Sequence, residues 1–295
     1  MDFRHALLAC ALTSAAITCH AKDGKPNAGA CSLAASPASA WLVRMPFEVI
    51  DGRIYVQAKV NRKESFRFAV DTGASGMARA DSSLVSTLGL KPHAQADNSD
   101  GVKTAKVETV MLDSIEIGGL ARRDLEVATR DYGGKKAAAE RFQGILARDF
   151  FNDGLLVIDY PRKTLYFSRS LALDPADRDV LRYERPFRIP MSIGSLQTEG
   201  NLDTGANVTF MLPKATFLQV GDKPLESAGN GTLANTVITT GESVVHGPFR
   251  LGNIHLQDQR VRVSDRIGEI YVGAHTLRNM TVMIDQRSKS IALCQ

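Results

Sequence analysis

Short segments in which apolar and polar residues alternate dominate the chain from about residue 42 onward. Ile54 to Val60 and Phe66 to Val70 are two of them, and Gly, Asn, Asp and Pro bound such segments. Side chains of a β-strand point alternately to opposite faces, so a period of two indicates half-buried strands joined by turns. Helical pattern is sparse, with short candidates at 82–90 and 213–220. We therefore expect an all-β fold.

One tripeptide occurs twice at equivalent places in this pattern. Asp71-Thr72-Gly73 and Asp203-Thr204-Gly205 each close an apolar run, and each is followed by alanine, Ala74 and Ala206. Two further pairs of segments repeat in the same order: Ile117-Gly118-Gly119-Leu120 with Leu251-Gly252-Asn253-Ile254, and Val157-Ile158-Asp159 with Met283-Ile284-Asp285. Self-similarity of this kind indicates a duplicated structural unit.

The repeat predicts two pseudo-symmetric, β-barrel-like lobes with a cleft between them. We place the N-terminal lobe at 42–170 and the C-terminal lobe at 185–295. The segment between them, 171–184, contains Asp174-Pro175 and residues of mixed charge, so we expect it to be a linker.

The N-terminus has the layout of a secretory signal peptide. Arg4 and His5 precede an apolar stretch and then small residues, so we expect residues 1–21 to be removed and the protein to be periplasmic or secreted. Lipoprotein anchoring at Cys19 is an alternative that the preceding residues fit poorly. Residues 22–41, rich in Ala, Gly, Ser and Pro, are expected to form a flexible leader.

Cleavage of that signal peptide leaves two cysteines, Cys31 and Cys294. In an oxidising compartment such a pair favours one disulfide, which would tie the leader to the last strand. The alternative is two unpaired thiols.

Composition narrows the classes of partner. The formal net charge of +4 is small and scattered, without an aromatic-interleaved basic patch, so we expect no nucleic acid partner. After the signal peptide no apolar run approaches the length of a membrane span, so we expect no stable membrane insertion. The histidines lack metal-ligand spacing, and we expect neither a metal nor another cofactor.

Two aspartates at equivalent places suit peptide hydrolysis. If two adjacent carboxyl groups share one proton, the ionised one takes a proton from water and the protonated one donates to the substrate carbonyl. Repulsion between like charges keeps the half-protonated pair populated over a working pH range, and aspartic proteases are the standard example of this behaviour. Glycine after Asp-Thr allows a close approach of the backbone, and threonine offers a hydroxyl that can cross-link the loops.

These residues identify a resemblance. Phe68 to Ser75, followed downstream by Gly144 to Asp149, resembles the retropepsin-like aspartyl proteases of bacteria, and the doubling within one chain is similar to the pepsin plan. The resemblance implies that Asp71 and Asp203 are catalytic, that the active-site loops are supported by Thr72, Gly73, Ala74, Thr204, Gly205 and Ala206, and that a peptide or protein is the substrate.

The same resemblance implies supporting segments and a flap. An apolar-apolar-Gly segment packs beneath each active-site loop, and here these segments are Ile145-Leu146-Ala147, with alanine in place of the usual glycine, and Tyr271-Val272-Gly273. A β-hairpin flap covers the cleft. The candidate in the first lobe is Asn98 to Gly101 with 102–107, and its counterpart in the second lobe is Gly229 to Thr232.

The expected protein is a monomeric aspartic endopeptidase. Because Ala74 and Ala206 cannot supply the hydroxyl that pepsins have after Asp-Thr-Gly, we predict a raised pKa for the pair and activity at weakly acidic to near-neutral pH. The alternative is a catalytically inactive peptide-binding or inhibitory module on the same fold.

Overall fold

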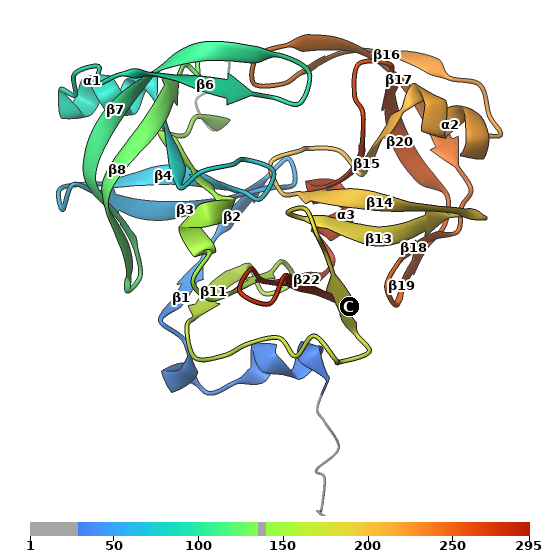
Figure 1. The fold of residues 1–295 in the computed structure, drawn as a ribbon, viewed down its shortest axis with the longest axis horizontal. Helices are drawn as coiled ribbons and strands as arrows, with labels where there is room; N and C mark the ends of the chain where they lie inside the picture. Colours follow the sequence, from blue (N-terminus) through green and yellow to red (C-terminus); the bar gives the residue numbers. More distant parts are fainter. Residues whose placement is uncertain (1–28, 135–139) are drawn as a thin grey trace, which may run out of the picture.

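The computed structural model describes residues 29–134 and 140–295, and strands dominate it (Figure 1). The expected signal peptide, 1–21, and the leader up to residue 28 lie outside the described residues. The prediction of an all-β fold with two β-barrel-like lobes is confirmed. Among the described helices, none is long and apolar enough to cross a membrane.

The first lobe is one sheet that curls so that strands β3 and β7 also pair. Its strand order is β2-β3-β4-β9-β5-β8-β7-β6. The bounds are β2 Glu48–Ile50, β3 Arg53–Val60, β4 Ser65–Asp71, β5 Ala78–Asp81, β6 Gln95–Ser99, β7 Thr104–Ile117, β8 Leu120–Arg130 and β9 Gly144–Ala147.

The second lobe repeats this order. Its sheet runs β16-β17-β20-β15-β21-β14-β13-β18-β19, so β13, β14, β21, β15, β20, β17 and β16 match β3, β4, β9, β5, β8, β7 and β6. The bounds are β13 Arg188–Ile193, β14 Leu196–Asp203, β15 Phe210–Pro213, β16 Glu226–Thr232, β17 Val237–Val245, β18 Phe249–Leu251, β19 Ile254–Leu256, β20 Gln259–Ser264 and β21 Ile270–Gly273.

A third sheet, drawn below the two lobes in Figure 1, joins them. Its order is β1-β11-β10-β22-β23-β12. The bounds are β1 Val43–Pro46, β10 Leu155–Asp159, β11 Thr164–Ser168, β12 Val180–Arg182, β22 Thr281–Asp285 and β23 Ser290–Cys294. Strands β10 and β22 come from opposite halves of the chain, pair antiparallel and are buried along their whole length. A continuous apolar run, rather than an alternating one, is what a strand covered on both faces requires.

The helices are short. They are α1 Ser82–Leu88, α2 Lys214–Val220, α3 Ala274–Leu277 and the 3₁₀-helices η1 Ala30–Ala35, η2 Ala38–Ala40 and η4 Arg148–Phe151. Helix α1 begins after Asp81, whose side chain accepts from the Ser83 N–H, and ends at Gly89, which takes a left-handed conformation at φ 63°. Both helices expected from the sequence are therefore present, as α1 and α2.

The segment 171–184, expected to be a linker, does more than connect the lobes. Its residues Val180–Arg182 form β12, which pairs with β23 at the edge of the joining sheet. Leu173 is buried, and its N–H donates to the Asp285 carboxylate at 3.2 Å.

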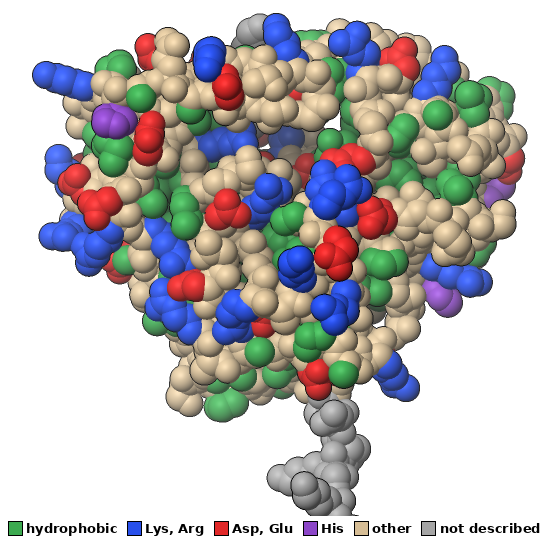
Figure 2. All heavy atoms as spheres, in the orientation of Figure 1, with side chains coloured by type: hydrophobic (Ala, Val, Ile, Leu, Met, Phe, Trp, Pro, Cys, Tyr) green, Lys and Arg blue, Asp and Glu red, His purple; other side chains and the backbone are tan. Residues whose placement is uncertain are grey.

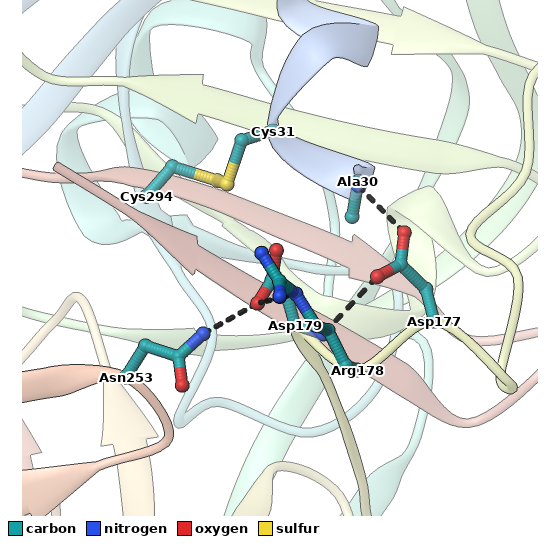
Figure 3. The surroundings of a disulfide bond; sticks show 7 residues. All are labelled: Ala30, Cys31, Asp177, Arg178, Asp179, Asn253 and Cys294. Carbon is teal, nitrogen blue, oxygen red and sulfur yellow. Dashed lines mark hydrogen bonds and ion pairs between the residues drawn. A yellow bond between two sulfur atoms is a disulfide. The ribbon is translucent and has the colours of Figure 1, made fainter. Parts of the chain in front are cut away.

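Residues 29–41 of the expected flexible leader are packed rather than loose. Ala30 and Trp41 are buried, the Trp41 ring lies 5.0 Å from that of Tyr166, and Cys31 forms the predicted disulfide with Cys294. Figure 3 shows this bridge beside the contact of the Ala30 N–H with the Asp177 carboxylate, 2.8 Å long. The small residues of the leader concealed this anchoring, because two buried side chains, Ala30 and Trp41, and one bridge are enough to hold a short segment.

Candidate active site

Each predicted aspartate is the last residue of a strand in the middle of its lobe. Asp71 ends β4, which runs parallel to β9, and Asp203 ends β14, which runs parallel to β21. The three residues before each aspartate, 68–70 and 200–202, are buried. The two strands therefore deliver both carboxyl groups to the surface where the lobes meet.

The two threonines cross-link the loops. The Thr72 hydroxyl donates to the Leu202 carbonyl at 2.8 Å and accepts from the Thr204 N–H at 3.0 Å. The Thr204 hydroxyl donates to the Val70 carbonyl at 2.7 Å and accepts from the Thr72 N–H at 3.1 Å. Both side chains are buried, with exposed fractions of 2% and 1%. Four hydrogen bonds in a dry environment fix the position of one loop against the other.

Each aspartate lies against the glycine of the opposite loop. A side-chain carbon placed on Gly73 would come within 2.5 Å of the Asp203 carboxyl carbon, and one placed on Gly205 would come within 2.4 Å of that of Asp71. Any residue larger than glycine would therefore collide with the opposing carboxyl group. Within its own loop, Asp71 accepts from the Ala74 N–H and Asp203 from the Gly205 N–H, both at 2.9 Å.

The surroundings of Asp203 change the titration of its carboxyl group. Burial first, and then the charge of Asp71 and a side-chain hydrogen bond to it, raise the pKa of Asp203 to about 7, although the Gly205 N–H and Arg53 act in the opposite direction. Two adjacent carboxyl groups that cannot both ionise hold one proton between them. Because burial and Asp71 cause this shift, it does not test the contribution that we expected from Ala74 and Ala206.

The supporting segments beneath the loops are β9 and β21. Ala147, the residue in place of the usual glycine, is fully buried in an apolar cluster with Ala74. At the matching place in the second lobe only glycine fits, because a side-chain carbon on Gly273 would lie 2.2 Å from the Val208 carbonyl. The alanine is therefore accommodated without loss of packing, and the two lobes differ in how tightly the loop covers this segment.

The residues that follow these segments also differ. In the first lobe the Asp149 carboxylate accepts from the Gly76 N–H at 3.0 Å and supports its own loop. In the second lobe His275 occupies the corresponding position, and its Nε2 lies 3.1 Å from both the carbonyl oxygen and the carboxylate of Asp51 in the first lobe. The missing Arg-Asp pair is thus replaced by a contact between the lobes.

Arg53, at the start of β3, was not singled out from the sequence. Its Nε donates to the Gly205 carbonyl at 2.6 Å and its Nη2 to the Asn207 Oδ1 at 3.2 Å. A residue of the first lobe therefore holds the active-site loop of the second. An arginine at the start of an amphipathic strand gives no local signal of this role, because the contact is made more than 150 residues away in the chain.

Two hairpins, one from each lobe, approach each other across the top of the molecule in the view of Figure 1. Strands β6 and β7 form the first-lobe hairpin, and its turn is 100–103. The expected flap segment therefore lies in this hairpin, but Asn98 and Ser99, where we expected the turn to begin, are the last residues of β6. The second-lobe hairpin is β16 and β17, but its turn lies at 233–236, because Gly229 to Thr232, where we expected the turn, belongs to strand β16. Figure 2 shows the molecule hollowed beneath the joined hairpins.

Asn235 connects the two hairpins. Its N–H donates to the Asp100 carboxylate at 2.6 Å, and its side-chain amide donates to the carbonyls of Asn98 at 2.6 Å and Lys103 at 2.8 Å. Arg130 donates to the remaining amide oxygen of Asn235. The contact joins turns from different lobes, so no local sequence pattern could predict it. It gives the cleft a roof with contributions from both lobes.

The described residues form no cluster of three or more His, Cys, Asp or Glu that could hold a metal ion.

Comparison with known proteins found a family match in the first lobe. Residues 56–150, which contain Asp71 and β9, match the family described as Aspartyl protease. A search of curated proteins found no match. Segment 56–150 is therefore similar to an aspartyl protease domain, which supports the resemblance drawn from the sequence.

Proposed function

We propose that the protein is an aspartic endopeptidase in which Asp71 and Asp203, one from each lobe, form a single catalytic pair. The observation that carries the proposal is the close approach of the two loops: each carboxyl group lies against the glycine of the other loop. In addition, the pKa of Asp203 is raised. The match to a protease family supports a hydrolytic function, and the pairing supplies a specific chemistry for it.

The proposed reaction uses one water molecule and no covalent intermediate. The ionised carboxylate removes a proton from water, whose oxygen attacks the peptide carbonyl carbon, while the protonated carboxyl group donates its proton to the carbonyl oxygen. Collapse of the resulting gem-diol breaks the carbon–nitrogen bond, and the leaving nitrogen takes the proton that came from water. The carboxyl group that gave up its proton recovers one from the gem-diol hydroxyl, so the pair ends with one proton, as it began.

The Asp203 pKa of about 7 sets the expected pH range. Below this value the pair retains a proton to donate, and above it both groups ionise and the acid is lost. We therefore expect kcat/KM to fall as the pH rises through about 7, which differs from an enzyme that is optimal only in strong acid.

The proposed substrate is an extended peptide or protein segment, and the proposed functional unit is a monomer, since one chain supplies both aspartates. The disulfide supports a periplasmic or secreted location, because such bonds persist in oxidising compartments.

Incubation of the protein with a mixed peptide library, with and without a statine-type inhibitor, tests the proposal. We expect internal cleavage, detected by mass spectrometry, that the inhibitor abolishes and that Asp203→Asn removes. Binding of peptides without any cleavage between pH 4 and pH 8 would instead identify an inactive peptide-binding module, and the proposal would then be wrong.

A further inference from the structure

The residue two places before each aspartate faces the same way as that aspartate. Side chains alternate along a strand, so Ala69 shares a sheet face with Asp71 in β4, and Asn201 shares one with Asp203 in β14. The neighbours of Ala69 and Asn201 on the adjacent strands therefore belong to the two faces that carry the catalytic pair.

On the first-lobe face these neighbours are apolar. Tyr55 lies opposite Ala69, and Ile145 lies beside it in the parallel pair. Phe142 completes a buried cluster with them, its ring 5.6 Å from that of Tyr55, and Tyr132 stacks on Phe142 at 6.0 Å. Aromatic rings fill this side.

On the second-lobe face the corresponding neighbours are polar. Arg188 lies opposite Asn201, and Tyr271 lies beside it. Arg188 donates to both carboxylate oxygens of Glu269, at 2.5 and 2.9 Å, and the Asn201 amide donates to the same carboxylate at 3.1 Å. After burial, the charge of Glu269 raises the pKa of the Tyr271 hydroxyl, so Tyr271 lies close to the same carboxylate. A bidentate ion pair of this kind has a fixed geometry.

This polar group lies beneath the first-lobe hairpin. A side-chain carbon placed on Gly101, in the turn between β6 and β7, would lie 3.4 Å from the Tyr271 hydroxyl. Tyr271 also lies close enough to Asp203 for the charge of that carboxylate to raise its pKa, after burial and Glu269, which act more strongly. Tyr271 therefore links the Arg188–Glu269 pair to the space between hairpin and aspartates.

A cavity of about 330 Å³ extends from this group. It is lined by Arg188, Asn201 and Glu269, together with Arg185 and Glu199, which form a second ion pair of 2.9 Å. Gly268 also lines it, five residues before Gly273, whereas the residue five places before Ala147 in the first lobe is Phe142. The absence of a side chain at Gly268 thus leaves open, in the second lobe, a place that an aromatic ring fills in the first.

The charges around the cavity decide what it accepts. Two guanidinium groups and two carboxylates, already paired, leave no net charge, so a lysine or a glutamate entering the cavity would meet a like charge at close range. A primary amide donates to a carboxylate and accepts from a guanidinium at the same time, so it matches both members of a pair.

We infer that this cavity is a specificity pocket for a neutral amide side chain, glutamine or asparagine, on one side of the cleaved bond, while the first-lobe face contacts an apolar side chain on the other. The inference rests on the proposed endopeptidase function and adds the substrate class. It makes Arg188 and Glu269 specificity-determining residues.

The cleavage profile of the wild-type protein on a mixed peptide library gives the first test. We expect glutamine or asparagine to be enriched at least about fivefold over lysine, glutamate and leucine at one position within three residues of the cleaved bond, which corresponds to about 1 kcal/mol. Apolar residues should be enriched on the opposite side only. The same preference on both sides, or an apolar preference throughout, would overturn the inference.

Two variants that each remove one charge give the second test. Glu269→Gln leaves the cavity with one excess positive charge, so the preference should move from glutamine toward glutamate by about tenfold, and Arg188→Gln should move it toward lysine by a similar factor. Glu242→Gln is the matched control, because Glu242 also pairs with arginines of the second lobe, Arg260 and Arg262, but does not line the cavity. If the control shifts the preference as much as Glu269→Gln does, or if neither cavity variant shifts it, the assignment of this pocket is wrong.

A binding measurement tests the specificity pocket separately from the proposed endopeptidase function on which the inference rests. Fluorescently labelled peptides that differ only by Gln, Glu, Lys or Leu at the chosen position can be titrated against the Asp71→Asn protein, in which turnover is not needed. Absence of cleavage by the wild type would remove the proposed function, yet a Kd that is at least fivefold lower for Gln would still support the pocket. Equal Kd values for the four peptides would reject it.

Discussion

Thr72 and Thr204 make the same two contacts to each other's loop. Each hydroxyl accepts from the backbone N–H of the other threonine and donates to the carbonyl that precedes the other aspartate. Because these bonds are buried at the meeting point of the lobes, they couple the position of Asp71 to the position of Asp203. The geometry of the carboxyl pair therefore depends on two residues that carry no carboxyl group themselves.

Replacement of Thr72 by valine tests this coupling. The variant keeps the shape of the side chain but leaves the Leu202 carbonyl and the Thr204 N–H without their partner, which should cost about 2–4 kcal/mol of unfolding free energy. Chemical denaturation measures the loss. Thr104→Val, at an exposed position of β7, is the matched control and should change the stability by less than about 0.5 kcal/mol. An equal effect of the two variants would show that the cross-link does not stabilise the fold.

The raised pKa of Asp203 predicts a pH-dependent gain in stability on replacement by asparagine. The folded pKa, about 7, exceeds the ordinary aspartate value of 3.8, so the folded wild type holds a proton that the unfolded chain has lost between these pH values. The wild type should therefore lose stability relative to Asp203→Asn from about pH 4 to pH 7, on the order of 2–4 kcal/mol, and the difference should be constant above. Thermal unfolding at pH 4, 6 and 8 measures it. A difference that shrinks as the pH rises would contradict the assignment.

Removal of the disulfide between Cys31 and Cys294 should lower the stability of the protein without lowering its activity. Changing Cys31 and Cys294 together to serine opens a loop that spans nearly the whole chain, and such losses are typically about 2–5 kcal/mol. The melting temperature should fall, while peptide cleavage at 25 °C should stay within about twofold of the wild type, because the bridge lies beside the joining sheet and not at the aspartates. Strong loss of activity in a variant that remains folded would place the bridge in the active-site machinery.

Asn235→Ala should loosen the roof of the cleft. The substitution removes the amide contacts to Asn98, Lys103 and Arg130, so amide hydrogen exchange in the segment 98–103 should become about tenfold faster, equivalent to about 1.4 kcal/mol. Asn230→Ala, at an exposed position in the same hairpin, serves as the control. Equal exchange in wild type and Asn235→Ala would mean that the hairpins are held together by other contacts.

The parts of this structure that local sequence could predict are those that repeat. Asp-Thr-Gly, its flanking apolar runs and the two alanines recur in order, and this duplication is enough to predict two all-β lobes with a carboxyl pair between them. The pairing of Cys31 with Cys294 followed from the small number of cysteines and was confirmed.

Contacts between residues that are far apart and not repeated could not be predicted. Strand β10 pairs with β22. Each is an ordinary apolar run, so the sequence of neither strand indicates which strand it pairs with. Asn235 and Arg53 are polar residues at strand ends or turns, where such residues are common, and their roles depend on how the lobes dock. The contrast between Tyr55 and Arg188 required the strand register, because only the register places these residues opposite Ala69 and Asn201.

Steady-state kinetics of the wild type, Asp71→Asn, Asp203→Asn and the double variant on one peptide substrate test the central claim most directly. If the two aspartates act as one unit, each single variant should lower kcat/KM by at least about 10³-fold, and the double variant should be no worse than the single ones. A single variant that keeps its activity within about tenfold of the wild type, in protein shown to be folded, would contradict a catalytic pair shared between the lobes.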